Sequence, residues 1–452
     1  MKSINPATGE EIARYDLLDA AGLESALAAA AATYDDWRRT ALSDRAALLT
    51  RLADVWQANR EPLARMATLE MGKTFKSALA EVDKCVAGFR HYASEGPDML
   101  QGGSIPLAAG RADIHWLPIG AVLAIMPWNF PYWQVVRFLA PCILAGNVGL
   151  LKHAGNVQGC AGLMIDMMVE AGAPDGLFQN LRVDHEAIPA IIADDRVAAV
   201  TLTGSEAAGV SVAEQAGRAL KKVVLELGGS DPFIVMPSAD LGKAVAAAVT
   251  ARVQNTGQSC ICGKRMIVHA DIYDAFHAKF AAAMAQVKTG DPFDEATVMG
   301  PLSTEKQRQT VIAQTWKFKA AGATLTGGEL IDGPGAFMTA GVLTDVPITP
   351  ELMGEEIFGP VAMLLRAADI DEAIDIANAI PFGLGSSVWT NDPAEEARFI
   401  RDIRSGMTAV NQMLASSPEA PFGGIRRSGH GRELSAQGLH EFMNLKTVYR
   451  PA

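Results

Sequence analysis

The sequence predicts an α/β protein in which helices cover both faces of a mostly parallel sheet. Short apolar runs of β-prone residues alternate along the chain with Ala-rich stretches of helical periodicity. The apolar runs are continuous, which is typical of parallel strands buried on both faces. With 452 residues the chain is long enough for two or three domains.

Composition excludes several classes of function. The chain has 39 Lys and Arg against 51 Asp and Glu, a net charge of −12, so nucleic-acid or anionic-membrane partners are not expected. The longest apolar stretch, 138–151, is too short for a membrane span and contains Pro141 and Asn147. The N-terminus lacks the apolar segment of a signal peptide.

Cysteine and histidine usage predicts neither disulfides nor a metal site. Five cysteines are few and odd in number, which favours a reducing cytoplasm. No C-x-x-C or H-E-x-x-H motif is present, so no metal is expected.

The first ninety residues predict helices. The apolar residues of the first helix recur at spacings of four and three: Leu23, Leu27, Ala30, Tyr34 and Trp37. A second helix is predicted after Ser43, acting as its N-cap, with an interruption at Pro62.

The α/β alternation begins near residue 119. Strands are predicted at 119–126, 148–151, 197–202, 223–227 and 233–236. Helices are predicted between them at 134–145, 157–172 and 206–220. A second series has helices at 240–256 and 272–287 and strands at 264–268, 361–366 and 386–390.

Three segments mark the organisation of the chain. The stretch 228–232 is a plausible crossover between two α/β domains. The Gly- and Pro-containing segment 97–116 predicts a hairpin that leaves the first domain, and 440–452 ends in a short β-prone run.

Three residues are candidates for chemistry on their local sequence. Cys260 follows a glycine and small polar residues that let a substrate approach; the alternative is a buried structural cysteine. Glu226 lies in an apolar strand, where burial would raise its pKa toward that of a general base; the alternative is a strand-end Glu facing solvent. Asn129, between Pro127 and Pro131, could donate to an oxyanion or simply form an Asx-turn.

A fourth motif is a candidate phosphate site. Thr203, Gly204 and Ser205 follow an apolar run and open a helix, where backbone N–H groups can bind phosphate. The segment is neither a Walker A nor a G-x-G-x-x-G motif, so alone it is a weak signal.

In combination these motifs are far more specific. Over essentially its whole length the chain resembles the NAD(P)-dependent aldehyde dehydrogenase superfamily. The resemblance rests on ordered motifs: Asn-Pro-Ala-Thr-Gly-Glu (5–10), Pro-Trp-Asn-Phe-Pro (127–131), Thr-Gly-Ser (203–205), Glu-Leu-Gly-Gly (226–229), Gly-Gln-Ser-Cys (257–260), Glu-Glu-Ile-Phe-Gly-Pro (355–360) and Pro-Phe-Gly-Gly (421–424).

The resemblance implies three parts. A Rossmann-like NAD(P)-binding domain would comprise 1–96 and 117–227, and a catalytic α/β domain 228–428. A small β element of 97–116 and 429–452 would mediate assembly into a homodimer or homotetramer.

The resemblance also assigns roles to residues. Cys260 would be the nucleophile toward an aldehyde, Asn129 and the Cys260 backbone N–H the oxyanion donors, and Glu226 the base that activates water. The cofactor-binding residues would be Trp128, Lys152, Gly204, Ser205, Leu227, Glu356 and Phe358. Gly155, where relatives often carry Glu or Ser, leaves the choice of cofactor open; NAD is favoured, with NADP possible.

The substrate prediction is succinate semialdehyde, because the chain is most like the compact bacterial succinate-semialdehyde dehydrogenase subgroup. Arg137 and Ser417 match residues that bind the substrate carboxylate, and Trp133 would form a pocket wall. Gln254 stands where some relatives have a second arginine, and Arg137 could instead be a surface or interface salt-bridge residue.

Further alternatives stay open. Cys262 is a candidate redox partner of Cys260, or a small residue lining the pocket. Another semialdehyde or an aliphatic aldehyde could be the substrate. A cofactor-independent cysteine hydrolase could use Cys260 and Glu226, whereas a CoA-acylating dehydrogenase would generally lack the base.

Overall fold

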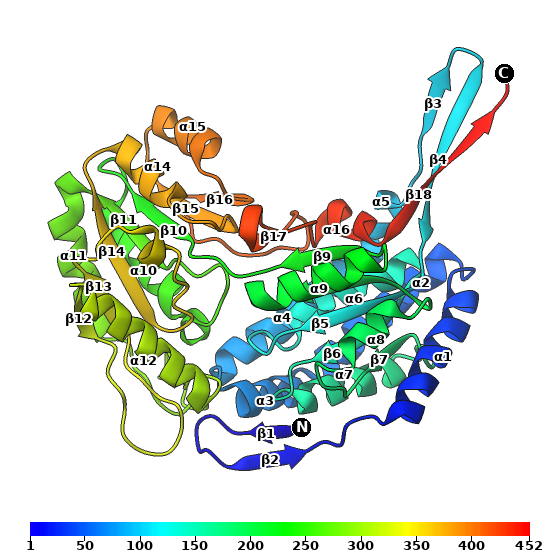
Figure 1. Cartoon of the computed structure of the whole chain (residues 1–452), viewed down its shortest axis with the longest axis horizontal. Coiled ribbons are helices and arrows are strands. Elements are labelled where there is room, and N and C mark those ends of the chain that lie inside the picture. The colour runs from blue at the N-terminus through cyan, green and yellow to red at the C-terminus, as the bar shows by residue number, and fades with distance from the viewer.

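The computed structural model describes all 452 residues, and its strands form four sheets. Two large sheets, each packed with helices, form two α/β bodies side by side, and a three-stranded arm extends from one of them (Figure 1). A short hairpin of β1 (Lys2–Ile4) and β2 (Glu11–Arg14) precedes the helices of the first body.

The N-terminal helices confirm most of the predicted pattern. The helices are α1 (Ala20–Trp37), α2 (Leu42–Ala58), α3 (Arg60–Met71), α4 (Phe75–Ser94) and the short α5 (Gly96–Met99). The predicted N-cap at Ser43 is wrong, because α2 already starts at Leu42 after Ala41. Pro62 lies in the first turn of α3, where a missing N–H breaks no helical hydrogen bond.

The first body is built on a six-stranded sheet in the order β17-β9-β8-β5-β6-β7, parallel except for β17. Its strands are β5 (Ala121–Met126), β6 (Val148–His153), β7 (Phe178–Asn180), β8 (Val197–Thr203), β9 (Lys222–Glu226) and β17 (Gly429–His430). Its crossover helices are α6 (Trp133–Ala145), α7 (Gln158–Glu170), α8 (Ile188–Ala193) and α9 (Glu206–Arg218).

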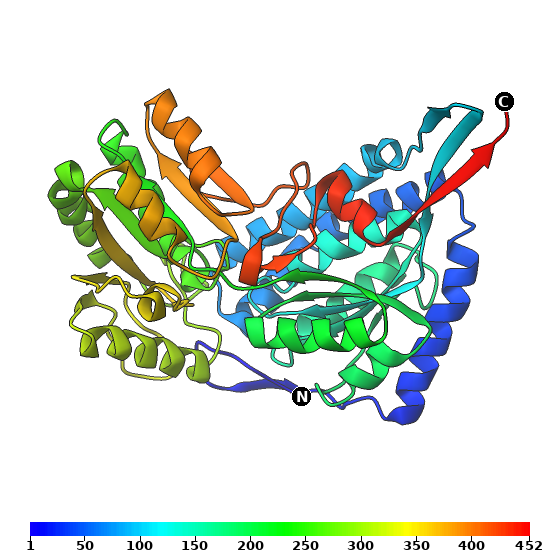
Figure 2. The same cartoon turned by 45° about the horizontal axis from the view of Figure 1, so that its top comes forward.

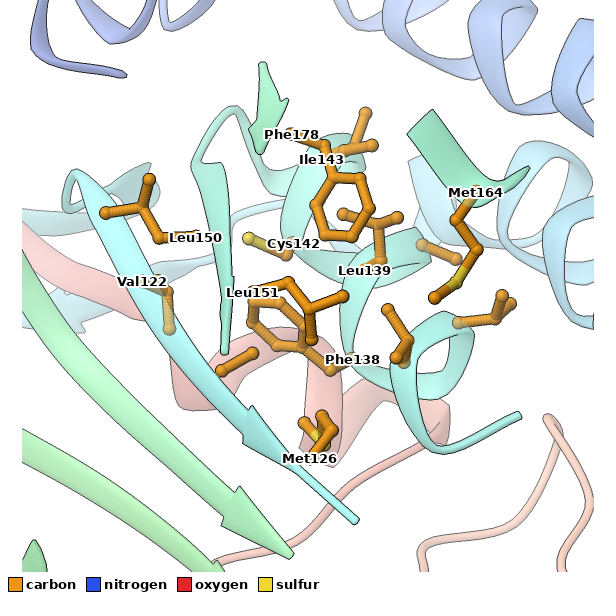
Figure 3. Close-up of a cluster of buried hydrophobic side chains, with 14 of the residues drawn as sticks. Val122, Met126, Phe138, Leu139, Cys142, Ile143, Leu150, Leu151, Met164 and Phe178 are labelled. Atoms are coloured by element: carbon orange, nitrogen blue, oxygen red, sulfur yellow. The ribbon is translucent and has the colours of Figure 1, made fainter. Parts of the chain in front are cut away.

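Helix α6 lies at the centre of the largest apolar core. All of its residues are buried, and Figure 3 shows Phe138, Leu139, Cys142 and Ile143 packed against side chains of the sheet and of α7. This burial explains the long apolar stretch in the sequence, since a helix that is apolar all round belongs inside a protein core. None of the helices is both long and apolar enough to cross a membrane.

The second body is built on a seven-stranded sheet in the order β12-β13-β14-β11-β10-β15-β16, in which only edge strand β12 is antiparallel. Its strands are β10 (Pro232–Val235), β11 (Arg265–His269), β12 (Thr324–Gly327), β13 (Gly341–Thr344), β14 (Val361–Ala367), β15 (Gly385–Trp389) and β16 (Met407–Val410). Its helices are α10 (Leu241–Val253), α11 (Ala270–Ala285), α12 (Glu305–Ala320), α13 (Pro350–Met353), α14 (Ile370–Asn378) and α15 (Pro393–Asp402).

Successive residues of β10 show why this second sheet is covered on both faces. Phe233 and Val235 belong to the core beneath α10 and α11, while Ile234 belongs to the core beneath α12, α14 and α15. Side chains of a strand alternate between the two faces, so both faces are apolar and both carry helices.

The arm contains β3 (Ser104–Leu107), β4 (Gly110–Pro118) and β18 (Met443–Arg450), with β4 in the middle, and it projects from the first body in both views (Figure 1 and Figure 2). It is smaller than the predicted β element. Residues 429–430 pair with β9 in the large sheet, and α16 (Ser435–Glu441) packs against α6.

Candidate active site

The ends of three parallel strands meet at one edge of the first sheet. The loop 127–131 follows β5, the segment 203–205 ends β8 and opens α9, and Glu226 ends β9. Ligands of α/β proteins bind at the carboxyl edge of the sheet. Here that edge faces α12 and the loop 356–358 of the second body, and a cavity of about 270 Å³ lies between them.

Most of the predicted functional residues line this first cavity: Cys260, Glu226, Asn129, Trp128, Gly204, Ser205, Leu227, Glu356 and Phe358. They come from both bodies, and their sequence positions span more than two hundred residues. The fold therefore brings together the predicted catalytic and cofactor-binding residues, with the exception of Lys152.

Cys260 lies on a loop with an unusual backbone. Asn255 and Thr256 have φ values of 53° and 57°, and Gly257 has φ of 72°, so three consecutive residues are left-handed. Such a conformation is rare for a β-branched residue and is kept where surrounding contacts enforce it. The Asn255 amide supplies such contacts by donating to the backbone oxygens of Asn129 (2.7 Å) and Gln258 (3.1 Å).

The environment of Cys260 sets it apart from the other cysteines. Cys260 is partly exposed, whereas the other four are buried. Burial of its sulfur raises the pKa of the Cys260 thiol to about 12, although the nearby charges of Arg137 and Lys264 lower it. Lys264 also holds the loop by donating to the backbone oxygens of Ser259 (3.0 Å) and Cys260 (2.5 Å).

Glu226 is buried rather than solvent-facing. Its side chain lies at the end of β9 with a relative exposure of 2%, and neither carboxylate oxygen has a hydrogen-bond partner. Burial, reinforced by the neighbouring carboxylate of Glu433, raises the pKa of Glu226 well above its usual range, against the opposing charge of Arg137. A carboxylate with a raised pKa can take a proton from water near neutral pH.

Asn129 has an amide fixed from two sides. Its Nδ2 donates to the Gln258 carbonyl oxygen (3.1 Å), and its Oδ1 accepts from Gln134 Nε2 (3.4 Å). These partners lie outside its own turn, which does not fit the Asx-turn alternative. Since an amide nitrogen carries two hydrogens, one donor remains for a ligand in the cavity.

The residues predicted to bind the cofactor form a frame around the first cavity. The rings of Trp128 and Phe358 meet edge to face at 5.9 Å, and Ser205 caps α9 by accepting from the Ala208 N–H (3.3 Å). At the same helix N-terminus, a Cβ on Gly204 would meet only the Leu202 side chain, at an ordinary contact distance of 3.6 Å. A bare helix N-terminus beside a carboxylate and aromatic rings fits the phosphate, ribose and ring of a dinucleotide.

Glu356 is held in this frame by residues that the sequence did not single out. Lys264 Nζ lies 2.9 Å from its carboxylate, and Gln314 Nε2 donates to its backbone oxygen (2.8 Å). A Cβ at Gly228 would collide with the Glu356 carboxylate, which explains the glycine there.

Lys152 lies outside the cavity wall. It is the penultimate residue of β6, paired in register with Ile125 on the neighbouring strand, so it lies at the same edge of the sheet. Burial lowers the pKa of the Lys152 ammonium, opposed by Asp184. A Cβ at the nearby Gly155 would meet Met1 at ordinary contact distance, and the glycine itself brings no carboxylate to this end of the site.

A second cavity of about 180 Å³ lies on the other side of Cys260. Cys260 and Gln134 line both cavities, so the cysteine forms part of the wall between them. The lining of the second cavity comprises Ser77, Ala80, Glu81, Lys84, Phe130, Trp133, Gln134, Arg137, Gln254, Ser259, Cys260, Ile261, Leu414, Ala415, Ser416 and Phe422.

Two of the three predicted substrate-binding residues line this second cavity, and the third does not. Trp133 and Arg137 are in its lining, but Arg137 is an internal salt-bridge residue, paired with the buried Glu433. Its Nη2 also donates to Thr203 Oγ1 (3.1 Å). The positive charge of Arg137 lowers the pKa of the nearby carboxyls of Glu226 and Glu433, against the effect of burial. Ser417 is not in the lining, because its hydroxyl turns to Glu419, and the adjacent Ser416 lines the cavity in its place.

Cys262 lines neither cavity. It is buried, and its Sγ lies 3.9 Å from the backbone oxygen of Gln254. The candidate redox role of Cys262 stays a prediction.

Comparison with known proteins supports the resemblance seen in the sequence. The model of the aldehyde dehydrogenase family matches residues 1–448. A protein named succinate-semialdehyde dehydrogenase [NADP(+)] from Mycolicibacterium paratuberculosis is 53% identical over 452 residues, covering 99% of this chain and 96% of that protein. A protein of the same name, numbered 1, from Mycobacterium tuberculosis is 52% identical over 451 residues, covering 99% of each chain.

Solved structures also match the fold over the length of the chain. The crystal structure of succinic semialdehyde dehydrogenase from Streptococcus pyogenes, in complex with NADP+ as the cofactor, superimposes with a TM-score of 0.98 at 36% identity and covers 100% of both chains. The similarity therefore extends over the whole chain.

Proposed function

Because this chain belongs to the aldehyde dehydrogenase family, we propose that it oxidises succinate semialdehyde to succinate with NADP+ as the hydride acceptor. The observation that carries the proposal is the position of Cys260 between two cavities. One cavity carries the frame for a dinucleotide, and the other is small, closed by Trp133 and lined by cationic side chains.

The reaction is assigned to residues of the first cavity. Cys260 reacts as the thiolate after its proton has passed to solvent. The sulfur adds to the aldehyde carbon, and the Asn129 amide and the Cys260 backbone N–H donate to the resulting oxyanion. The nicotinamide of bound NADP+ supplies the acceptor for the hydride that leaves this carbon. A thioester then remains on Cys260. Glu226 takes a proton from water, the water oxygen attacks the thioester carbon, and the acid leaves while Cys260 recovers its proton.

The cofactor proposal corrects the expectation from sequence. NAD was favoured there, but the relatives are named for NADP(+) and the Streptococcus pyogenes structure holds NADP+. Gly155 supports the change because it brings no acidic side chain that would repel a 2′-phosphate, and Lys152 provides a cation at this edge of the sheet. Lower KM for NADP+ than for NAD+ is expected; the reverse order would return the assignment to NAD.

A panel of aldehydes tests the substrate. Formation of reduced nicotinamide is followed by absorbance with succinate semialdehyde, glutarate semialdehyde, butanal and benzaldehyde. The proposal requires the highest kcat/KM with succinate semialdehyde. Equal kcat/KM values for butanal and succinate semialdehyde would contradict recognition of the carboxylate. A preference for another aldehyde would mean that the enzyme is an aldehyde dehydrogenase with a different substrate.

The hydrolase alternative makes a different prediction. A cofactor-independent cysteine hydrolase would turn over esters and form no reduced nicotinamide from any aldehyde. The protein would be assigned as a hydrolase only if both of these results were obtained.

We propose that the protein assembles into a homodimer or homotetramer through the arm. We also propose that it is located in the cytoplasm, which is supported by its five free cysteines.

A further inference from the structure

We infer that Lys264 acts on the reaction through the peptide group that joins Ser259 to Cys260. By polarising the carbonyl of this group, it strengthens the Cys260 backbone N–H as a donor to the oxyanion. Lys264 lines neither cavity, so it is a positioning residue rather than a catalytic one. The inference rests on the proposed function, because the oxyanion arises only if Cys260 adds to an aldehyde.

The backbone of Lys264 is fixed by the second sheet. Lys264 directly precedes β11, and its N–H donates to the Asp231 carbonyl oxygen (3.0 Å). Its own carbonyl oxygen accepts from the Met363 N–H of β14 (2.9 Å), and its side chain is fully buried. The ammonium group is therefore held at a defined place next to the loop that carries Cys260.

The Lys264 ammonium group is directed at the backbone of this loop. Its Nζ donates to the carbonyl oxygens of Ser259 (3.0 Å) and Cys260 (2.5 Å). The Glu356 carboxylate lies 2.9 Å from the same nitrogen and supplies the counterion that a buried ammonium requires. Burial raises the pKa of the Cys260 thiol, and the charge of Lys264 is among those that lower it, so this charge acts on the active site.

The two ends of the peptide group between Ser259 and Cys260 point in opposite directions. The chain has no cis peptide bond, so the Ser259 carbonyl and the Cys260 N–H are antiparallel. The carbonyl oxygen accepts from Lys264 and from the Cys262 N–H (3.3 Å). The N–H at the other end has no partner within the protein, so it is free to donate to a ligand at Cys260.

A hydrogen bond to the carbonyl of a peptide group strengthens its N–H as a donor. A bond from a charged donor is about twice as strong as one between neutral groups, and successive hydrogen bonds in a protein interior polarise one another. Electron density drawn toward the Ser259 oxygen leaves the Cys260 N–H more positive. This N–H then better stabilises the negative charge that develops on the aldehyde oxygen.

The deciding experiment compares two reactions of Cys260 that differ in whether an oxyanion forms. Alkylation by iodoacetamide forms the S–C bond as iodide leaves, and no negative charge develops on an oxygen atom. Oxidation of succinate semialdehyde, measured as kcat/KM with saturating NADP+, passes through the oxyanion. Both reactions start from the same thiol, so the thiolate fraction cancels in the ratio of the two rate constants at one pH with NADP+ bound.

Lys264→Met removes the ammonium group and keeps the length of the side chain. We expect the ratio of kcat/KM to the alkylation rate constant to fall by roughly tenfold, a part of the roughly 10²–10³-fold effect of losing a whole oxyanion donor. Lys264→Gln keeps a neutral donor, so the ratio should fall less, by about threefold. If circular dichroism shows that Lys264→Met is unfolded, Lys264→Gln takes its place with that expected result.

Arg252→Met is the matched control. Arg252 is another fully buried cation beside the same loop, but it donates to the Gly257 carbonyl oxygen (2.7 Å) and not to the peptide group between Ser259 and Cys260. Its loss should lower both rate constants in parallel and leave their ratio unchanged.

The outcomes separate this inference from the proposed function. If Lys264→Met lowers both rate constants equally, Lys264 merely holds the loop and the inference is wrong. A fall of the ratio in Arg252→Met as large as that in Lys264→Met would also contradict it, because any disturbance of the loop would then have the same effect. If the wild-type protein forms no reduced nicotinamide from any aldehyde, the proposed function itself fails, whatever the variants do.

Discussion

Glu226 is the residue that we propose as the base in the second half of the reaction. Its buried carboxylate has a raised pKa and lines the cavity with Cys260. In a Glu226→Gln variant the first turnover should proceed and the thioester should accumulate. We expect a burst of about one reduced nicotinamide per site, followed by a steady state slower by roughly 10²–10⁴-fold. Stopped-flow absorbance measures both phases, and an undiminished steady-state rate would exclude Glu226 as the base.

The free amide hydrogen of Asn129 is the proposed oxyanion donor. Asn129→Ala should lower kcat by roughly 10²–10³-fold, since removal of one such donor has that effect in other enzymes. KM should change little, because the ground-state aldehyde makes a weaker bond to the donor. Steady-state kinetics distinguishes this from the opposite pattern, a raised KM with normal kcat, which would make Asn129 a substrate-binding residue only.

Cys260 titrates well above neutral pH in the unliganded protein, because burial outweighs the positive charges beside it. Its alkylation by iodoacetamide should accelerate about tenfold per pH unit between pH 7 and 9, as the thiolate fraction grows. Cys260→Ser serves as the control for labelling elsewhere. A rate that levels off below pH 8 would contradict a raised pKa.

At this residue scale the sequence predicted most of the residues that line the first cavity, but not all of the residues that contact them. Cys260, Glu226 and Asn129 stand in short motifs that can be read locally. The pairing of Arg137 with Glu433 joins residues nearly three hundred positions apart, so only the fold reveals it. Ser416 rather than the predicted Ser417 lines the second cavity, because the direction of a side chain in a loop depends on its backbone angles, which the sequence does not give.

At the scale of elements, the active-site loop 127–131 depends on a buried ion pair. Lys73 and Glu81 are almost fully buried, and Glu81 also accepts two backbone N–H groups at the start of α6. Glu81→Leu leaves an unpaired buried ammonium and two orphaned N–H groups, so it should destabilise the fold by about 3–5 kcal/mol. Lys73→Met should cost less, since the N-terminus of α6 still compensates the carboxylate.

Urea denaturation at a fixed protein concentration measures both substitutions. Arg60, whose salt bridge with Asp83 is partly exposed, provides a matched control, and Arg60→Met should change stability by less than about 1 kcal/mol. A larger loss for Lys73→Met than for Glu81→Leu would contradict the role of Glu81 at α6.

Most elements of the two large sheets could be predicted, and the reason is burial. β5, β6, β8, β9 and β10 each lie within about two residues of a predicted apolar run. Helix α12 and strand β12 were missed because their sequences are polar, and β13 because its apolar run, Val342 and Leu343, is too short to stand out. The strand β17 could not be found at all, since two residues become a strand only by pairing with β9.

At the scale of the whole molecule, the arm exposes apolar side chains that a monomer would leave in water. Leu445 and Tyr449 of β18 are 51% and 75% exposed, and the arm stands apart from both bodies (Figure 2). Unpaired strands with exposed apolar side chains favour association with another chain. The double substitution Leu445→Asp and Tyr449→Asp should reduce the assembly to monomers of about 47.8 kDa in light scattering.

A control for this prediction is available on the first body. Leu220 is 95% exposed and lies outside the arm, so Leu220→Asp should leave the mass in solution unchanged. Monomeric wild-type protein at micromolar concentration would contradict assembly through the arm. The extent of the arm was harder to predict than its existence, because hydrophobicity cannot tell β18 from the adjacent α16, which packs on α6.

The central claim is that one cysteine, placed between a cofactor cavity and a substrate cavity, carries the substrate as a thioester. Mass spectrometry of the Glu226→Gln variant, quenched after mixing with succinate semialdehyde and NADP+, tests it most directly. The account predicts a succinyl group on the peptide containing Cys260, dependent on the cofactor. An unmodified Cys260 peptide, or a succinyl group that forms without NADP+, would contradict it.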